Sequence, residues 1–579
     1  MKKYQIFSLA ALACVGLASC NDFLDDNRYP LTVEVDNPLF WNETANCDKQ
    51  CDQLYSYYSG YGRANNLGEF YFQTLSDDQC GNGFVTWNNT NVPASSSNYT
   101  SPYQVIRHCE YIIAGMASSS LDPAVKANYE GIARLNRAQQ YFNLVKMYGD
   151  VTWVGGVVDI TNDGVLYGAR TNRDEVMDKV LEDLTYACQN ITAQANKLAW
   201  SKDMANAIKS YICLWEGTFC RYRTQAENGY GPNEERAKKF LEESVKAAEA
   251  VMSQGYTLNE DYRTKYISLS AQLKANNEII FMRNYDKSLL RHSTESYTAS
   301  STMQNGLTKD LFDAYLFSDG LPKALTSCDT SDAGEMGEDG YLHIDKLLAV
   351  RDKRLAETTD PCAYYAGFPW VRAGAAGLTT STGYGVSKFD NTTLTPITDR
   401  TQSAQNFICA PLLWLSDIYC QFAEAKAELG TLTDDDLNRS INKIFTRSGL
   451  PTRTVAELAA IADPANNMGV SNLLWEIRRC RRCELVMDKG YRYWDLVRWH
   501  QLDKLDNTLY PNIALGANVT AALALKNDKG ETLYPINNVN GYVEGYFGGT
   551  RRYDARQYLY PIPQGQLNLA PEIKQNPGW

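Results

Sequence analysis

The chain has 579 residues, of which 44% are hydrophobic and 21% are charged, and this balance excludes a wholly disordered protein. Lys and Arg number 56 against 68 Asp and Glu, so the formal net charge is −12. Because an acidic chain is a poor binder of polyanions, no nucleic-acid partner is expected. The 4 histidines are scattered without metal-ligand spacing, so neither a metal site nor a cofactor is expected.

Residues 1–19 have the pattern of a bacterial signal peptide. Two lysines precede an apolar stretch over 6–17, which is shorter than the roughly 20 residues of a membrane span. The segment ends Leu-Ala-Ser before Cys20, which resembles a lipobox. We therefore expect cleavage before Cys20 and lipidation of its thiol, which would anchor the protein to a membrane surface without spanning it. The alternative is an ordinary secretory signal followed by an incidental cysteine.

Helical periodicity dominates two regions, where apolar residues recur at three- and four-residue steps. The helices predicted in the first region span 47–60, 102–117, 124–148, 172–190, 203–222 and 234–253. Those predicted in the second region span 411–429, 434–447 and 472–489. Successive helix pairs of this kind indicate an α-solenoid scaffold, although no clean repeat of about 34 residues is present.

The segment between these regions has a different composition. Residues 285–409 are rich in Ser, Thr, Gly, Tyr and Asp, with helix signals only near 309–316 and 341–355. Such segments usually form surface loops and short strands, which often carry binding groups. Residues 505–579 are loop-like as well, with Pro and Asn throughout.

The cysteines do not define a disulfide framework. Outside the signal segment and the lipid site an odd number remains, so at least one thiol is unpaired, and the other pairings stay open. Cys480 and Cys483 have C-x-x-C spacing, but they lie in a predicted helix without a second pair. We interpret them as packing residues and not as a redox or zinc site.

Four arginines between Arg478 and Arg482 allow two interpretations. A basic cluster is typical of nucleic-acid binding, but it can also form ion pairs on a helix. Glu476 can reach Arg479, and Arg481 can reach Glu484, because both pairs are three residues apart. We favour the interpretation as an ion-pair network.

Short motifs follow one another in a fixed order along the chain. Examples are Arg-Ala at 137–138 with Tyr-Gly-Asp-Val at 148–151, Phe-Ala-Glu-Ala at 422–425, and Gly-Tyr-Arg-Tyr-Trp-Asp-Leu-Val-Arg-Trp at 490–499. The chain ends with Pro-Ile-Pro at 561–563 and Gln-Asn-Pro-Gly-Trp at 575–579. In this order the motifs resemble the SusD/RagB family of outer-membrane nutrient-binding lipoproteins over essentially the whole mature chain.

The resemblance implies a mainly α fold. TPR-like helix pairs, an α-α superhelix, would form the scaffold, and a loop-rich region with short strands would lie on it. The implied parts are the signal peptide over 1–19, a SusD-like N-terminal part with helix pairs over 20–270, and a C-terminal part over 271–579. The C-terminal part would be loop-rich at 285–409 and helical at 411–499.

The resemblance also implies a function without catalysis. The protein would be lipid-anchored at the outer membrane, exposed on the cell surface, and would capture oligosaccharides for a SusC-like TonB-dependent transporter. Three alternatives stay open: an oligopeptide-binding lid of the same kind of transporter, a surface glycoside hydrolase, and an adhesin or scaffold without a soluble small ligand. No catalytic motif of a serine hydrolase, zinc protease or P-loop NTPase is present, and no catalytic residue is expected.

Candidate ligand contacts come from the chemistry of sugars, which present apolar faces and hydroxyl rims. An exposed aromatic ring beside Asp, Asn, Gln or Arg matches both surfaces. The candidates are Asp77, Asp78, Trp87, Asn88 and Tyr99 in one segment, Trp370, Arg372 and Tyr384 in another, and Tyr297 as a third position. For each aromatic residue, the alternative is packing within a loop or against a protein partner.

Overall fold

The computed structural model describes residues 38–63, 66–159, 161–193, 196–299, 305–374 and 377–579. The predicted signal peptide over 1–19 and the predicted lipid site at Cys20 lie outside these residues. Within them, every helix is too short or too polar to cross a membrane.

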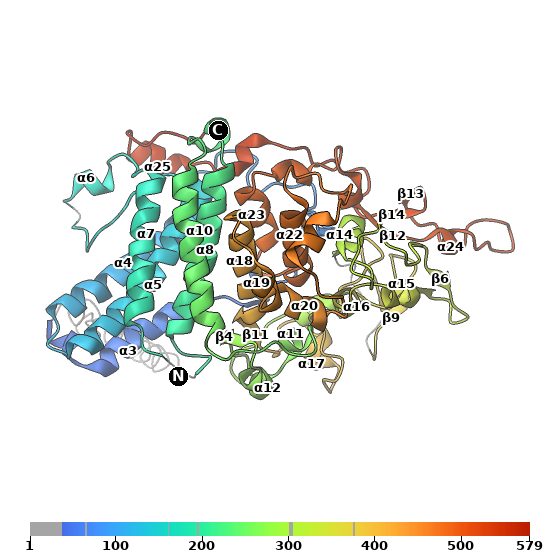
Figure 1. The fold of residues 1–579 in the computed structure, drawn as a ribbon, viewed down its shortest axis with the longest axis horizontal. Helices are drawn as coiled ribbons and strands as arrows, with labels where there is room; N and C mark the ends of the chain where they lie inside the picture. The colour runs from blue at the N-terminus through green and yellow to red at the C-terminus, as the bar shows by residue number, and fades with distance from the viewer. Residues whose placement is uncertain (1–37, 64–65, 160, 194–195, 300–304, 375–376) are drawn as a thin grey trace, which may run out of the picture.

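Long helices lie side by side in an array that occupies the left and centre of Figure 1. In order, the array contains α4 (Ser97–Ser118), α5 (Pro123–Tyr148), α7 (Arg173–Asn190), α8 (Lys202–Tyr222), α10 (Glu234–Met252), α18 (Leu415–Glu428) and α22 (Asn472–Glu484). Each helix packs against the next one. The predicted mainly α fold with a TPR-like helical scaffold is confirmed.

Side-chain caps explain where several array helices begin. Asp122 accepts a hydrogen bond from the Ala124 amide at the start of α5, and Pro123 occupies the first turn. Asn172, Ser201 and Asn233 cap α7, α8 and α10 in the same way. Each cap satisfies one of the backbone N–H groups that a helix N-terminus leaves without a partner.

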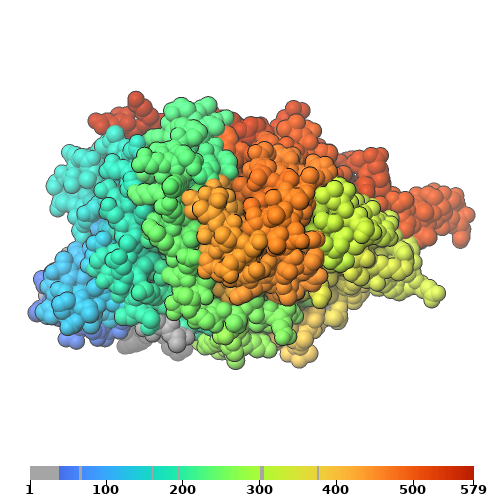
Figure 2. Space-filling model, in the orientation of Figure 1, coloured from blue at the N-terminus to red at the C-terminus, as the bar shows by residue number. Residues whose placement is uncertain are grey.

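The loop-rich region is inserted between two neighbours of the array. Although residues 253–414 separate α10 from α18, these helices pack together, and Figure 2 shows green and orange surfaces meeting there. The inserted segment contains β4 (Ile279–Arg283) and ends with β11 (Ala410–Trp414), and these strands pair antiparallel with Arg283 opposite Ala410. The loops between the two strands therefore leave the scaffold and return to it at one place.

The remaining elements are short, and most of the strands lie to the right in Figure 1. The helices are α3 (Thr44–Gln53), α6 (Asp163–Leu166), α9 (Gln225–Asn228), α11 (Thr264–Ile267), α12 (Ser270–Ala275), α13 (Thr294–Thr298), α14 (Lys309–Ala314), α15 (Asp345–Ala349), α16 (Lys353–Thr358), α17 (Thr398–Thr401), α19 (Asp434–Asn438), α20 (Ile441–Arg447), α21 (Val455–Ala460), α23 (Tyr491–Arg498), α24 (Thr520–Leu523) and α25 (Gln564–Leu569). The 3-10 helices are η2 (Pro38–Asn42), η3 (Leu54–Tyr57), η4 (Leu502–Leu505), η5 (Pro511–Ala514) and η6 (Ala555–Tyr558).

The described strands form sheets of two or three strands. The two-stranded sheets besides β4–β11 are β1 (Tyr61–Arg63) with β2 (Asn66–Gly68), β3 (Gln79–Cys80) with β5 (Gly306–Leu307), and β9 (Trp370–Val371) with β10 (Gly377–Leu378). The three-stranded sheets have the orders β6 (Glu335–Met336), β7 (Leu342–His343), β8 (Cys362–Ala363), and β12 (Leu515–Asn518), β14 (Tyr542–Glu544), β13 (Asn538–Val539).

Several predicted helices have wrong boundaries. The one predicted over 434–447 is two helices, α19 and α20, and the one predicted over 102–117 begins earlier, at Ser97. The one predicted over 411–429 begins at Leu415, because the five residues before it are all buried in β11. The one predicted over 472–489 ends at Glu484, and Met487 and Lys489 have φ angles of 59° and 52°, which no α-helix accommodates. The one predicted over 47–60 is α3 followed by the 3-10 helix η3.

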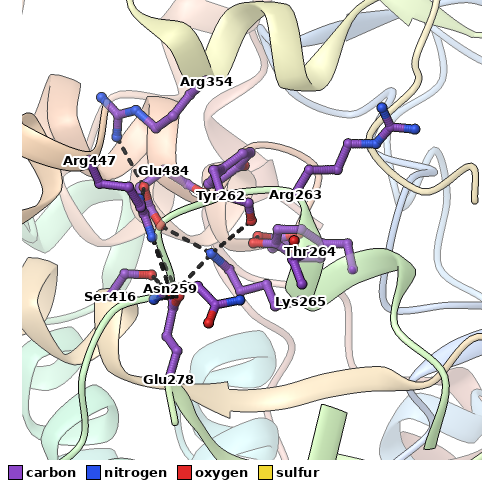
Figure 3. A network of polar contacts seen from close by, with 12 residues as sticks. Asn259, Tyr262, Arg263, Thr264, Lys265, Glu278, Arg354, Ser416, Arg447 and Glu484 are labelled. Carbon is purple, nitrogen blue, oxygen red and sulfur yellow. Dashed lines mark hydrogen bonds and ion pairs between the residues drawn. The ribbon is translucent and has the colours of Figure 1, made fainter. Parts of the chain in front are cut away.

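A buried network of charges joins the inserted region to the array (Figure 3). The Glu484 carboxylate on α22 accepts from Arg447 on α20 at 2.5 Å and from Arg354 on α16 at 3.1 Å, and Lys265 on α11 lies 3.5 Å away. Lys265 also lies 3.1 Å from Glu278, the residue before β4. These contacts hold four helices and a strand in one place.

The arginine cluster on α22 belongs to the same interior, which confirms its interpretation as an ion-pair network. The expected pair of Arg479 with Glu476 is present at 3.1 Å. The expected partner of Arg481 was wrong, because Arg481 pairs with Asp417 on α18 at 3.0 Å and with Asp495 on α23 at 2.9 Å. Spacing along one helix cannot reveal partners that come from other helices.

We predict that Glu484→Gln lowers the free energy of unfolding by about 3–5 kcal/mol, because three buried cations lose their shared anion. Burial raises the pKa of the Glu484 carboxyl, but Arg447, Lys265 and Arg354 outweigh burial and hold this pKa well below its usual value. The carboxylate therefore stabilises the fold above its unfolded pKa of about 4.3, and this stabilisation is lost as the pH falls below that value.

Chemical denaturation at pH 7 and pH 4 measures both effects. The control is Glu234→Gln, which removes the partner of Arg221 at a side chain that is 68% exposed and should cost less than about 1 kcal/mol. Equal stability losses in the two variants would contradict the structural role of the Glu484 network.

Candidate functional site

A cavity of about 220 Å³ lies between α5, α8 and β11, and we call it the α5 pocket. Its charged lining consists of Glu69, Lys146 and Lys489. Its amide and aromatic lining consists of Gln139, Gln140, Asn143, Tyr57, Tyr58, Phe142, Tyr211 and Tyr491. The pocket therefore combines apolar rings with hydrogen-bonding groups in one concave surface.

The polar groups of the pocket come mainly from one face of α5. Gln139, Asn143 and Lys146 are spaced by four and three residues, so they project from the same side of the helix. The adjoining Ala138 and Val145 are buried in the core of the array. A helix between two neighbours thus keeps one polar strip, and that strip faces a cavity.

Lys146 is the least satisfied group of the pocket. Among the described residues its ammonium makes neither a hydrogen bond nor an ion pair, and it lies 4.6 Å from the centre of the Trp494 ring and 5.2 Å from that of Phe142. Burial lowers the pKa of Lys146 to about 8, against an opposing effect of the Glu69 carboxylate. A largely desolvated ammonium over two rings can donate hydrogen bonds to a bound molecule.

The other groups at the rim have partial partners. Lys489 donates to the Leu412 carbonyl at 3.0 Å, and Glu69 accepts from the Ser59 hydroxyl at 3.0 Å. The Tyr58 hydroxyl donates to the Gln139 side-chain oxygen. Burial raises the pKa of Tyr58 well above its ordinary value, so this phenol stays neutral.

The predicted contact Asn88 lies two aromatic rings away from the pocket. Its side-chain amide donates to the Tyr560 hydroxyl at 2.5 Å. The Tyr560 ring lies 6.2 Å from Trp494, whose ring covers Lys146. Asn88 is exposed, so this row of side chains extends from the pocket to the surface.

Tyr297 lies beside the same region. Its ring meets Phe72 edge-to-face at 4.7 Å. The preceding residue, Tyr71, donates its amide to the Met487 carbonyl at 3.0 Å, which brings this segment next to Lys489. Both Phe72 and Tyr297 are partly exposed.

Trp87 and Trp370 are half-buried and lie in separate environments. The Trp87 indole donates to the Arg552 carbonyl at 3.0 Å. Trp370 in β9 stacks on Tyr364 at 5.9 Å. Within the described part of the chain, neither indole makes a hydrogen bond or a ring contact with the lining of the α5 pocket.

Two predicted contacts on the first segment are buried ion-pair partners. Asp77 is 3% exposed and binds Arg492 through both oxygens at 2.7 and 2.6 Å. Asp78 is 1% exposed and binds Arg482 at 2.7 Å. Although Asp77 lines a cavity, arginines already bind both carboxylates, and we reassign these two residues to the stability of the fold.

Three further predicted contacts also lie in the interior. Arg372 reaches Asp390 at 2.8 Å and pairs with Asp360 as well. The Tyr384 ring stacks on Phe312 at 4.5 Å, and Tyr99 packs edge-to-face on Tyr148 at 5.0 Å. Because all three are buried, we reassign them to packing.

The sequence interpretation missed Lys146, the amide strip of α5 and Trp494. The apolar periodicity of 124–148 predicted the helix and its buried face, but it does not show which polar residues of the helix line a cavity. Their spacing was the available signal, since Gln139, Asn143 and Lys146 recur at helical steps inside an otherwise buried segment.

A larger cavity of about 390 Å³ lies between α14, α22 and η5, but its charges are paired. Arg482 binds Asp78 and Asp310, and Arg479 binds Asp463. These cations are neutralised from within the protein, so the α5 pocket is the better candidate for ligand recognition.

The described residues contain one cluster that could hold a metal ion. Their one cluster with suitable ligand spacing contains Asp174, Glu216 and Cys220. Arg173 and Arg223 already neutralise its carboxylates at 2.7 Å or less. All described cysteines are free thiols, including Cys480 and Cys483.

Residues 277–579 match the model of the SusD family, and residues 22–214 match a model described as starch-binding associating with outer membrane. The first match covers more than half of the chain. The chain belongs to the SusD family. No curated protein sequence matches it.

Solved structures share this fold. A SusD-like carbohydrate-binding protein from Bacteroides fragilis NCTC 9343 has a TM-score of 0.69 at 20% identity, covering 92% of this chain and 100% of that one. A SusD superfamily protein from Parabacteroides distasonis ATCC 8503 has a TM-score of 0.57 at 17% identity, covering 93% and 99%. A structure with xylogluco-oligosaccharide has a TM-score of 0.56 at 18% identity, covering 91% and 97%.

We predict that Arg372→Met lowers the free energy of unfolding by about 3–5 kcal/mol and leaves ligand affinity unchanged. The substitution leaves Asp360 and Asp390 buried with fewer cationic partners, while the α5 pocket keeps its lining. Thermal unfolding and ligand titration of the folded variant measure the two effects.

The control is Arg556→Met, because Arg556 pairs with Asp554 at 2.7 Å but is 41% exposed. This change should cost less than about 1 kcal/mol. A loss of affinity with unchanged stability in Arg372→Met would restore Arg372 as a ligand contact.

Proposed function

We propose that this SusD-family protein is a lipid-anchored receptor on the outer surface of the cell that binds oligosaccharides and delivers them to a SusC-like TonB-dependent transporter. The observation that carries the proposal is the α5 pocket, where Lys146, which has no ion-pair partner among the described residues, and the amides of Gln139 and Asn143 face a cavity beside aromatic rings. The family models and the relative bound to a xylogluco-oligosaccharide support the same ligand class.

The lining of the pocket suits the two surfaces of a sugar. The Tyr57 ring, 44% exposed, offers an apolar face to the C–H groups of a pyranose ring. The amides of Gln140 and Asn143, which make no hydrogen bond among the described residues, can donate to and accept from hydroxyl groups. Such contacts are individually weak and reversible, as capture followed by release requires.

The α5 pocket gives no support to a glycoside hydrolase. That chemistry generally needs two carboxyl groups on opposite sides of the scissile bond. Among the described residues, Glu69 is the one carboxylate that lines the pocket, and it accepts a hydrogen bond from Ser59. Binding without turnover is therefore the function that this geometry supports, with an oligopeptide as the alternative ligand.

We predict that Tyr57→Ala weakens oligosaccharide binding by about tenfold, because the loss of a stacking ring costs on the order of 1–1.5 kcal/mol. The matched control is Tyr167→Ala, which removes a ring of similar exposure, 45%, directly after α6 and outside the lining of the α5 pocket. Calorimetric titration with mixed plant and bacterial oligosaccharides, and with a peptide pool, measures affinity.

The control should bind as the unmodified protein does. If the protein binds peptides but no glycan, its ligand is a peptide and not an oligosaccharide. If it binds neither pool, or if it depolymerises a polysaccharide, the proposed function is wrong.

We predict that Cys20→Ser moves the protein from the membrane fraction to a soluble fraction and abolishes its contribution to glycan uptake, because the lipid is its expected anchor. Cell fractionation and uptake of a labelled oligosaccharide measure the result. Cys328→Ser is the control, since Cys328 is a partly exposed free thiol far along the chain. Unchanged membrane association of Cys20→Ser would exclude lipid anchoring at this residue.

A further inference from the structure

The α5 pocket carries an excess of positive charge inside an acidic protein. Its charged lining consists of the cations Lys146 and Lys489 and the single anion Glu69, whereas the whole chain has a net charge of −12. The phenols of Tyr58, Tyr211 and Tyr491 line the same space, and burial raises their pKa values, so they add no negative charge. The pocket is therefore locally cationic.

Lys146 is partly buried, and it differs from the fully buried lysines of the protein. Lys265 lies 3.1 Å from Glu278, Lys388 lies 2.8 Å from Asp488, and Lys209 lies 2.7 Å from Glu243. Lys146 has no such partner among the described residues, and the nearby Glu69 is not within ion-pair distance. Because a partly buried ammonium is incompletely hydrated, an anionic group of a ligand in the pocket would provide the partner that the protein does not.

Lys489 directs a second cation toward the same space. Its backbone has a φ of 52°, a left-handed conformation that is uncommon for a lysine. Its ammonium uses one hydrogen bond on the Leu412 carbonyl, which leaves two N–H donors. Together with the three donors of Lys146, this matches a group with several negatively charged oxygens.

On these observations we propose that the α5 pocket recognises an anionic substituent of the bound oligosaccharide, either the carboxylate of a uronic acid or a sulfate ester. This inference rests on the proposed function and specifies its substrate class. Lysine ammonium groups are point charges without a planar fork, so both substituents satisfy them. Gln140 and Asn143 would bind hydroxyl groups next to the anion.

The proposal implies a pH dependence. Burial lowers the pKa of Lys146 to about 8, so the free pocket loses its positive charge as the pH rises through this value. The charged groups that face Lys146 are Lys489, from the turn before α23, and Glu69, from the segment after β2. Affinity for an acidic oligosaccharide should therefore fall between pH 7 and pH 9, whereas affinity for a neutral one should not.

The test compares acidic oligosaccharides with neutral counterparts of the same backbone. The probes are uronic-acid oligosaccharides with their carboxyl-reduced forms, and sulfated oligosaccharides with their desulfated forms, titrated against the mature protein. We expect the acidic form of one pair to bind at least tenfold more tightly. Lys146→Met and Lys489→Met should each reduce this preference about tenfold, whereas Lys238→Met, at a 67% exposed side chain on α10, should leave it unchanged.

A stability measurement separates recognition from a structural role. If Lys146 serves the ligand, Lys146→Met should keep or raise the melting temperature of the free protein while it lowers affinity for the acidic form. Equal binding of both forms, or preference for the neutral ones, would overturn the anionic-ligand proposal and leave the proposed function intact. Absence of binding to every probe, acidic and neutral, would count against the proposed function as well.

Discussion

The fold depends on carboxylates that are buried together with arginines and lysines. Glu484 is fully buried and receives Arg354, Arg447 and Lys265 from three different helices. Each of these ions would be costly to bury alone, so the helices can come together only in the arrangement that pairs all of them. Apolar helix faces alone would be compatible with several packing arrangements, and the need to pair the buried charges selects one of them.

The pairing of cations in the interior also distinguishes Lys146 from the other basic residues. Where the interior pairs its cations, it forms structure, as Arg482 does with Asp78 and Asp310 beside the larger cavity. Lys146, which lacks an anionic partner among the described residues, lines the α5 pocket, where we propose that a ligand supplies the anion. The distinction between scaffold and site in this protein therefore lies in the completeness of the ion pairs and not in the residue types.

The sequence predicts the array well and the site poorly, for a physical reason. The helix expected over 172–190 is found at Arg173–Asn190, because amphipathic periodicity and capping are local properties. Arg482 and Asp78 pair across 404 positions, and no local pattern reveals such a contact. Residue type suggested that Arg372 and Tyr384 could bind sugars, but burial decides whether they are available, and burial is a property of the whole fold.

The pairing of Arg283 with Ala410 has a consequence for how the family can vary. In a segment whose two ends are paired through β4 and β11, the loops that carry none of the buried ion pairs, unlike those with Arg354 and Lys388, can lengthen or shorten without displacing α10 from α18. The cost of a longer loop grows only with the logarithm of its length. Because β4 and β11 hold the two ends of the inserted segment together, evolution or protein engineering could change its surface loops. The packing of the helices next to the two strands would stay the same.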